Sequence, residues 1–471
     1  MPSNLPTLTR VLVLAVAAIG FLFDTYELLM FPVIGRDALS ELLKVPGTDP
    51  AVRLWTGRLL WIAALSGGVF GLLGGWLIDR LGRKTIMVAS ILAYSLSPVA
   101  AAFSTELWQL ILFRCTTFVG VCVELVAAVT WLAELFDDKR TREKAIAWSL
   151  AAASLGGILV TEVFIHIKGI AGDIPALPVA EGSNGHAAWR YTLLTGLIPG
   201  AMILALLPFV PESQVWKREK MEGTLKRPRF GELFAPALRR TTLVTTVVSA
   251  CGYAAAFGAL QLTPPQIVPG VPAVATQAAD FDAKIKAAST PAEKKELGEA
   301  KGKMIQGYSG DIQRWQEIGG LTGRILLALL VLFVPSRWLL RIFLIPGILL
   351  FPLTYLEVVK MDYALFAASI FFCGLVTVAQ FSFLSEFLPK VFPLHLRGTG
   401  GSFATNVGGR MIGTMAATLN TEWLSKLFAT EFDKPTPLDV AKAAALIGGV
   451  VYLIAFAMSF LLPSPTKADE V

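Results

Sequence analysis

Charged residues are scarce in this chain of 471 residues. Asp, Glu, Lys and Arg together make up 16% of it, whereas a soluble globular protein carries about 25% charged residues. Apolar residues make up 54%. A chain with so few charged residues and so many apolar ones is not expected to form the polar surface of a soluble globular protein. The composition therefore predicts a polytopic membrane protein.

Histidine and cysteine are also few, at 3 and 4 residues. The sequence contains no HExxH pattern, no Cys/His cluster and no Ser/His/Asp arrangement that three scattered histidines could serve. We therefore expect neither an enzyme nor a metal or cofactor site. The cysteines are expected to be free thiols, because all of them fall within apolar segments: Cys115, Cys122, Cys251 and Cys373.

The net charge of +6 does not indicate a nucleic-acid partner. The basic residues stand in short blocks between apolar runs rather than in one stripe, which is typical of the loops that orient a membrane protein. A phosphate loop is excluded at "GGWLIDRLGRKT", because Arg83 separates Gly82 from Lys84 where that motif requires Gly-Lys-Ser/Thr.

Apolar runs long enough to cross a bilayer recur along the whole chain. A spanning helix needs about 20 predominantly apolar residues. Twelve runs meet this requirement, approximately 10–34, 55–78, 85–104, 107–133, 145–166, 190–210, 241–262, 315–334, 338–357, 363–386, 398–422 and 440–462.

The polar segment between the sixth and seventh runs sets the expected orientation. It carries eight basic residues: Lys217, Arg218, Lys220, Lys226, Arg227, Arg229, Arg239 and Arg240. By the positive-inside rule this segment is cytoplasmic. With six spans on either side, both termini are then cytoplasmic too. We expect a multi-pass protein of the plasma membrane, or of the inner membrane if the source is bacterial.

The two halves of the chain resemble one another. "AELFDDKRTR" follows the fourth run and "SEFLPKVFPLHLR" follows the tenth. The pattern predicts an all-α membrane protein with twelve transmembrane helices in two pseudo-symmetric six-helix bundles, a design common among secondary transporters. We place the first bundle at 1–211, a cytoplasmic linker at 212–240 and the second bundle at 241–471.

An extracytoplasmic insertion is expected at 264–314, within the second bundle. It is rich in Ala, Lys and Glu and could form one or two exposed helices. We expect a solvated insertion without a ligand of its own; a lid or a partner-docking segment is the alternative.

The loop after the second run carries the most specific motif. It resembles the signature G-x-x-x-D-R-x-G-R-[RK] of the major facilitator superfamily, and the matching residues are Gly75, Asp79, Arg80, Gly82, Arg83 and Lys84. This resemblance implies a cytoplasmic gate formed by ion pairs and helix-end contacts. We assign to the gate Gly75, Asp79, Arg80, Gly82, Arg83, Glu134 and Arg142.

Other segments resemble symporters of that superfamily. Arg114 and Glu134 bracket the fourth run as in its sugar and organic-acid symporters, and "VPES" at 210–213 ends the sixth run as in the same groups. "GFLFDTYEL" is similar to the "GFFFDGYDL" pattern of aromatic-acid/proton symporters, and "RGTGGSFATNVGGRMIG" at 397–413 resembles their eleventh helix. The fifth run lacks the Gly-Pro-rich signature of the superfamily's drug antiporters, which favours uptake over efflux.

Several ionisable residues fall inside apolar runs of the first half. At ~1.5 Å of rise per residue, Asp24 and Glu27 lie ~21 and ~25 Å above Arg10, Glu124 lies ~15 Å and Arg114 ~30 Å above the inner end of the fourth run. Isolated charges in lipid are costly, so such groups are paired, protonated or functional. We expect Glu27 and Arg114 to be within reach of each other. Proton coupling is assigned to Asp24, Glu27, Arg114 and Glu124; a permanent salt bridge or a water-filled vestibule is the alternative.

The second half offers two arginines near mid-depth, Arg324 and Arg410. Two guanidiniums facing a cavity could clamp a carboxylate; alternatively, Arg324 pairs with Glu317 and Arg410 serves helix packing. The complete set of expected substrate-binding residues is Tyr26, Tyr253, Gln261, Arg324, Gln380, Asn406 and Arg410.

Together these features predict a monomeric secondary transporter that works by alternating access. We expect it to take up a small polar metabolite, an organic anion, with a proton, so that the proton gradient is the driving force and no cofactor is needed. A sugar or polyol proton symporter or facilitator is the alternative, since it would share the features of the fourth and sixth runs. A sensor that has lost transport is a third possibility.

Overall fold

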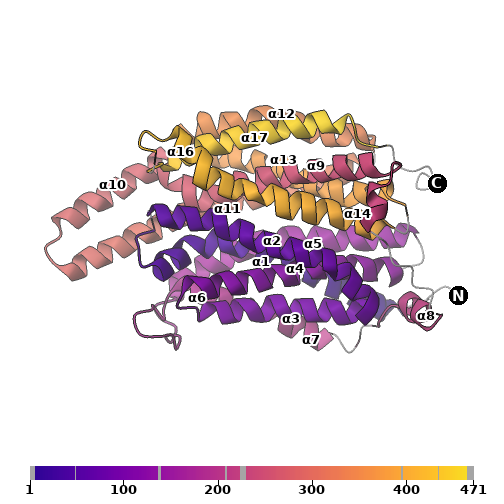
Figure 1. Cartoon of the computed structure of the whole chain (residues 1–471). Helices are drawn as coiled ribbons and strands as arrows, with labels where there is room; N and C mark the ends of the chain where they lie inside the picture. The colour runs from indigo at the N-terminus through magenta and orange to yellow at the C-terminus, as the bar shows by residue number, and fades with distance from the viewer. Residues whose placement is uncertain are drawn as a thin grey trace.

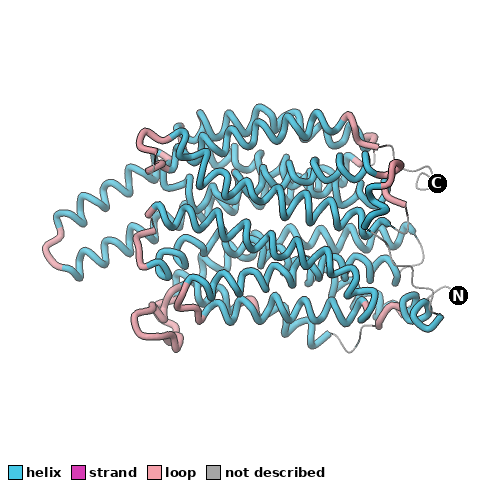
Figure 2. Tube along the Cα trace, viewed as in Figure 1, coloured by secondary structure: helices cyan, strands magenta, loops and turns pink. Residues whose placement is uncertain are grey.

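The computed structural model describes residues 6–47, 49–135, 139–206, 209, 211–222, 230–331, 333–393, 396–432 and 434–463. Every regular element within these ranges is helical (Figure 2). Nine of the described segments are long and apolar enough to cross a membrane. The other three spans of the twelve-helix fold are α5, the C-terminal part of α11 and the series of short helices from α14 to α16.

The first half is built from long helices that match the predicted runs. Its elements are α1 (Thr7–Leu43), α2 (Pro50–Leu81), α3 (Arg83–Ala102), α4 (Leu107–Leu135), α5 (Lys139–Ile170), α6 (Ala188–Leu194), α7 (Leu197–Leu206) and, after the last span, α8 (Gln214–Glu222). The sixth span is divided into α6 and α7, with Thr195 and Gly196 between them.

The second half contains more interruptions. Its longer helices are α9 (Arg239–Gly258), α10 (Pro272–Ala287), α11 (Pro291–Leu330), α12 (Ser336–Leu356), α13 (Tyr363–Val391) and α17 (Pro437–Ser459). The eleventh span is a series of short α, π and 3₁₀ segments: α14 (Arg397–Phe403), η8 (Ala404–Ile412), η9 (Gly413–Met415), α15 (Ala416–Thr418), η10 (Leu419–Leu424) and α16 (Ser425–Phe428). Shorter turns are η2 (Phe230–Phe234), η3 (Leu260–Leu262), η4 (Thr263–Ile267), η5 (Val268–Gly270) and η6 (Val358–Lys360).

The helices run side by side in two groups, one for each half of the chain (Figure 1). The packing repeats between them: α1 packs on α5 and α2 on α4 in the first half, while α9 packs on η8 and α11 on α13 in the second. The halves meet where α2 contacts η8 and where α5 contacts α11. Helices at equivalent positions in the two halves therefore make the same contacts within each half. Helices at equivalent positions also form these two contacts between the halves.

The distribution of side chains is that of a membrane protein. The buried apolar residues form two large clusters, one almost wholly in each half. Large apolar side chains also face outward, such as Phe70 at 49% exposure and Leu349 at 73%. Many polar and charged side chains are buried in contrast, so the polar groups lie inside and the apolar surface faces lipid.

The insertion at 264–314 contains α10 and the first part of α11, so α11 begins well before the predicted eighth run. These two helices form a hairpin that projects beyond the bundle, at the end opposite both termini (Figure 1). Lys301 Nζ on α11 contacts both carboxylate oxygens of Asp282 on α10 at 2.6 Å. Gln277 Nε2 donates to Tyr308 Oη at 2.7 Å. The hairpin is therefore held together by polar contacts between its own helices.

Candidate transport site

Two carboxyl groups of the first half meet where α1 packs beside α4. Asp24 is 7% exposed and Glu124 is fully buried, and the two carboxyl groups are electrostatic neighbours. Gly20 on α1 leaves room for the Glu124 carboxyl, which occupies the space that a Cβ at that position would need. Two ionised carboxylates side by side in a buried position repel each other. A proton on one of the two groups removes that repulsion.

Arg410 approaches this acid pair from the second half. Its guanidinium is 4% exposed, its Nη1 donates to Asn406 Oδ1 at 2.7 Å, and its electrostatic neighbours include Asp24 and Cys122 of the first half. Arg410 and Asn406 both lie on the π-helical segment η8. π-Helical segments are rare in proteins, and those that occur are often found at functional sites.

Glycines of α2 permit this approach between the halves. Gly68 faces Met411 and the Cβ of Arg410, and Gly71 faces the carboxamide of Asn406. On the first-half side, Gly67 faces Cys122 Sγ. Because these α2 positions carry no side chain, the π-helical segment lies close enough for Arg410 to interact with the acid pair.

Aromatic and amide groups of the second half surround Arg410. Tyr253 on α9 is an electrostatic neighbour of the guanidinium, and its ring lies edge-on to Phe381 at 4.9 Å between centroids. Gln380 on α13 is buried and donates to the carbonyl of Val376 at 3.3 Å. Of the predicted residues, Tyr253 and Asn406 thus lie near Arg410, and Gln380 lies beside Gly252, the neighbour of Tyr253. The fourth, Gln261, is buried in η3, farther along the chain from Tyr253.

Arg114 and Glu27 also meet, but through the backbone. Both terminal nitrogens of Arg114 donate to the carbonyl oxygen of Glu27 at 3.2 Å, and the guanidinium lies over the ring of Phe118 at 5.3 Å. Pro32 lies in the adjoining turn of α1, where its missing N–H removes the helical donor of the Leu28 carbonyl. The two carboxylate oxygens of Glu27 are buried without a hydrogen-bond partner among the described residues. They pack beside Gly196 and Pro98.

The two mid-depth arginines have different neighbours. Arg324 interacts electrostatically with Glu317 on its own helix, which is the alternative arrangement considered from the sequence, whereas Arg410 faces the first half. The contacts of the described residues therefore do not place both guanidiniums around one carboxylate. Tyr26 also differs from the expectation of a cavity-lining residue. Its hydroxyl bonds Thr195 Oγ1 within the first half, and the side chain is 1% exposed.

The signature loop is held at the end of the molecule that carries the termini. Arg83 Nη2 donates to Glu134 Oε1 at 2.8 Å, and Glu212 accepts from the backbone N–H of Lys84 at 3.0 Å. Gly82 has φ +103°, a value that favours glycine. For Gly75, Asp79 and Arg142 the described structure includes the helical backbone only, and the side chain of Arg80 is exposed.

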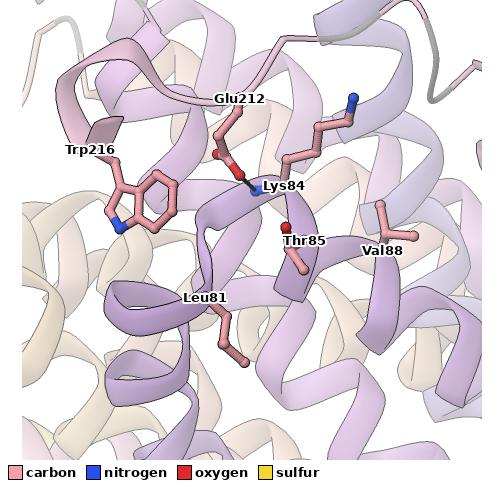
Figure 3. A pocket seen from close by; sticks show the side chains of 6 residues that line it. All are labelled: Leu81, Lys84, Thr85, Val88, Glu212 and Trp216. Carbon is pink, nitrogen blue, oxygen red and sulfur yellow. Dashed lines mark hydrogen bonds between the residues drawn. The ribbon is translucent and has the colours of Figure 1, made fainter. Parts of the chain in front are cut away.

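A pocket of about 500 Å³ lies beside this loop, lined by Leu81, Lys84, Thr85, Val88, Glu212 and Trp216 (Figure 3). All of its lining comes from α2, α3 and the start of the linker, so the pocket is not the space between the halves. Glu212 was not predicted as a gate residue, although it belongs to the quoted "VPES" segment.

Polar contacts close the opposite end of the interface between the halves. Arg58 on α2 forms an ion pair with Glu422 on η10, and Trp61 Nε1 donates to the carbonyl of Met411 at 2.9 Å. Arg314 Nη2 on α11 donates to Glu162 Oε2 on α5 at 3.0 Å. The halves are therefore tied together on both sides of the interface at the end that carries the hairpin.

Comparison with known proteins identifies the family. The family model described as Major Facilitator Superfamily matches residues 10–281, more than half of the chain. The chain belongs to the major facilitator superfamily. The resemblance seen in the signature loop is thereby confirmed, and the arrangement of two six-helix bundles is that of the superfamily.

Relatives in the superfamily transport different compounds. The sialic acid transporter NanX of Escherichia coli K12 is 24% identical over 414 residues, which cover 87% of this chain and 86% of that protein. The 4-hydroxybenzoate transporter PcaK of Pseudomonas aeruginosa is 33% identical over 154 residues, which cover 32% of this chain and 30% of that protein. These relatives are transporters and not enzymes, as the sequence predicted for this chain.

Solved structures of the superfamily share the fold. The xylose transporter XylE from E. coli, in a partially occluded inward-open conformation, matches with a TM-score of 0.66 at 15% identity over 98% of this chain and 99% of that chain. At this identity the match shows a common major-facilitator fold.

Proposed function

We propose that this major-facilitator protein is a proton-coupled symporter of a small organic anion that works as a monomer by alternating access. The observation that carries the proposal is the meeting of Asp24 and Glu124 from the first half with Arg410 from the second. A pair of buried acids and a cation thus face each other across the interface that alternating access opens and closes. The names of the relatives, which include transporters of sialic acid and 4-hydroxybenzoate, support an acidic substrate.

Arg410 is the proposed ligand of the substrate carboxylate. Arginine offers a planar pair of donors that matches a carboxylate, and Asn406 fixes the guanidinium at 2.7 Å. Tyr253 and Gln380 supply further polar and aromatic surface beside it. We leave Tyr26 and Arg324 out of the substrate set, because their described contacts lie with Thr195 and Glu317. Gln261 stays an untested expectation.

Asp24 and Glu124 are the proposed proton carriers, with Glu27 as a further acid of the same half. A proton on the pair removes negative charge from beside Arg410, which favours the binding of an anion there. When substrate and proton are released, the deprotonated pair carries more negative charge, and this charge attracts the guanidinium of Arg410. The transporter can then change conformation when it holds both substrate and proton or when it holds neither. The change is disfavoured when only the substrate or only the proton is bound.

The proposed orientation places both termini in the cytoplasm and the hairpin outside the plasma membrane. The cluster of basic residues between α7 and α9 supports it. In this orientation the contacts of Arg58 and Arg314 lie on the outer side of the interface. Arg83, Glu134 and the rest of the signature loop then belong to the cytoplasmic gate.

Uptake into proteoliposomes tests the proposal. An inward proton gradient should drive accumulation of a radiolabelled monocarboxylate, and Arg410→Lys should weaken its apparent affinity despite keeping the charge, because lysine cannot make the planar two-point contact. If neutral sugars compete as well as acids and uptake ignores pH, the sugar or polyol alternative replaces the anion. If no solute is transported at all, the sensor hypothesis replaces both.

A further inference from the structure

A second buried polar cluster lies on α11, where it packs against α5 of the other half. The cluster consists of Gln313, Gln316 and Glu317, which are 0%, 3% and 8% exposed. Glu317 Oε2 packs against Gly157 of α5, and the backbone of Gln316 packs against Gly374 of α13. The cluster therefore lies at the second contact between the halves, on the opposite side of the interface from the contact of α2 with η8.

The hydrogen bonds inside this cluster fix how both amides point. Gln313 Nε2 donates to Glu317 Oε1 at 2.8 Å, and Gln316 Nε2 donates to the same oxygen at 3.2 Å. In both bonds the amide nitrogen is turned toward Glu317 and the amide oxygen is turned away from it.

The two amide oxygens are left without a partner. Gln313 Oε1 and Gln316 Oε1 are both buried, and neither has a hydrogen-bond partner among the residues that the structure describes. A buried acceptor without a donor costs about 1–3 kcal/mol and calls for an explanation. Both unpartnered atoms are amide oxygens, which only accept hydrogen bonds. A ligand that bonds to them must therefore carry hydrogen-bond donors.

The position of the cluster relative to Arg410 relates it to the proposed transport site. Gln316 packs at Gly374 on α13, while Gln380 on the same helix lies beside Gly252, the neighbour of Tyr253. Gly374 and Gln380 are separated by six residues, or about 9 Å along the helix axis. A single small molecule can span an axial distance of this size.

We propose that Gln313 and Gln316 form a hydroxyl-binding subsite, and that the substrate is a hydroxylated carboxylic acid of sugar-acid type. The inference rests on the proposed function, because it takes Arg410 as the ligand of the carboxylate. Hydroxyl groups at the other end of the molecule donate to the two amide oxygens. Glu317 is a positioning residue, since it orients both amides without needing to touch the substrate.

Two acids with the same six-carbon skeleton test the subsite. D-gluconate carries hydroxyl groups along its chain and hexanoate carries none, so the pair differs in donors while the carboxylate is kept. Isothermal titration of the purified wild-type protein should show tighter binding of gluconate than of hexanoate. Equal or tighter binding of hexanoate overturns the inference without the need for any variant.

Single-residue variants test whether the preference for gluconate over hexanoate depends on the two glutamines. Gln313→Met and Gln316→Met keep the length of the side chain and remove the amide, and each should weaken gluconate binding about fivefold, the effect of one hydrogen bond of about 1 kcal/mol. Hexanoate binding should stay at the wild-type level. The matched control is Gln277→Met on the outer hairpin, which should change neither affinity. Equal weakening of both acids by the α11 variants indicates a general structural defect and overturns the subsite.

The same titrations separate this inference from the proposed function. Arg410→Lys should weaken both acids alike. If it does so while the glutamine variants fail to distinguish gluconate from hexanoate, the anion site stands and the hydroxyl subsite falls. If Arg410→Lys leaves both affinities unchanged, or if the wild-type protein binds neither acid, the anion site is wrong and the subsite falls with it.

Discussion

Replacing Glu124 with glutamine separates proton coupling from substrate translocation. Glutamine keeps the size and the hydrogen-bonding capacity of the side chain but cannot ionise. Two full negative charges on neighbouring side chains ~4 Å apart repel by about 4 kcal/mol at an effective dielectric near 20. The native pair of Asp24 and Glu124 is therefore expected to hold one proton in the loaded state. In Glu124→Gln that requirement no longer exists, because one member is permanently neutral.

The size of the effect on affinity follows from the position of the pair beside Arg410. A substrate carboxylate ~8 Å from an extra negative charge is destabilised by about 2 kcal/mol at the same effective dielectric, which corresponds to a roughly thirtyfold change in affinity. In the wild-type protein, apparent affinity for an acid should rise by about this factor as pH falls through the titration of the pair. In Glu124→Gln the affinity should vary much less with pH.

The assay compares two fluxes in proteoliposomes that hold the same protein. Glu124→Gln should lose accumulation driven by a proton gradient and should retain exchange of labelled for unlabelled acid. The matched control is Glu106→Gln, because Glu106 is exposed near the start of α4, and it should accumulate substrate normally. Full gradient-driven accumulation by Glu124→Gln, with wild-type pH dependence, would refute the role of the acid pair.

Three further predictions concern neighbouring features. Glu27→Gln should also abolish uphill accumulation while leaving exchange, and normal accumulation in that variant would remove Glu27 from the coupling path. Arg114→Ala should lower the melting temperature, since it removes two donors from a buried carbonyl, at a cost of about 1.5–3 kcal/mol for hydrogen bonds to a charged group; an unchanged melting curve would contradict the geometry. A cysteine at Lys284 should react with an impermeant thiol reagent in whole cells and one at Met221 should not, and the opposite labelling pattern would reverse the proposed orientation.

The sequence alone was sufficient to predict the architecture of this transporter. Twelve apolar runs and the signature loop predicted the fold that the family match and the structural neighbours confirm. Axial position could also be estimated, because rise per residue in a helix is constant. The estimate correctly placed Arg114 beside Glu27.

The partners of individual side chains were harder to predict, because they depend on the rotation of each helix about its own axis. The sequence suggested that Arg114 would meet the carboxylate of Glu27, whereas its guanidinium donates to the carbonyl of Glu27 instead. Tyr26 was expected to line a cavity but faces Thr195. Such rotations are set by glycines on neighbouring helices, such as Gly156, which lies against the α1 backbone at Leu22, and a single sequence does not show which glycines face which helix.

The described contacts between the halves are of a kind that a transport cycle can make and break. At the hairpin end the halves are joined in part by polar pairs, and partly exposed pairs such as Arg314 with Glu162, at 37% and 45% side-chain exposure, contribute only about 0–1 kcal/mol each. Within each half the buried apolar clusters are extensive, and separating their helices would cost far more. Each half can therefore move as a rigid unit while the interface opens. Under the proposed mechanism, the charge on Asp24 and Glu124 and the presence of an anion on Arg410 would then decide which of the two facing states is populated.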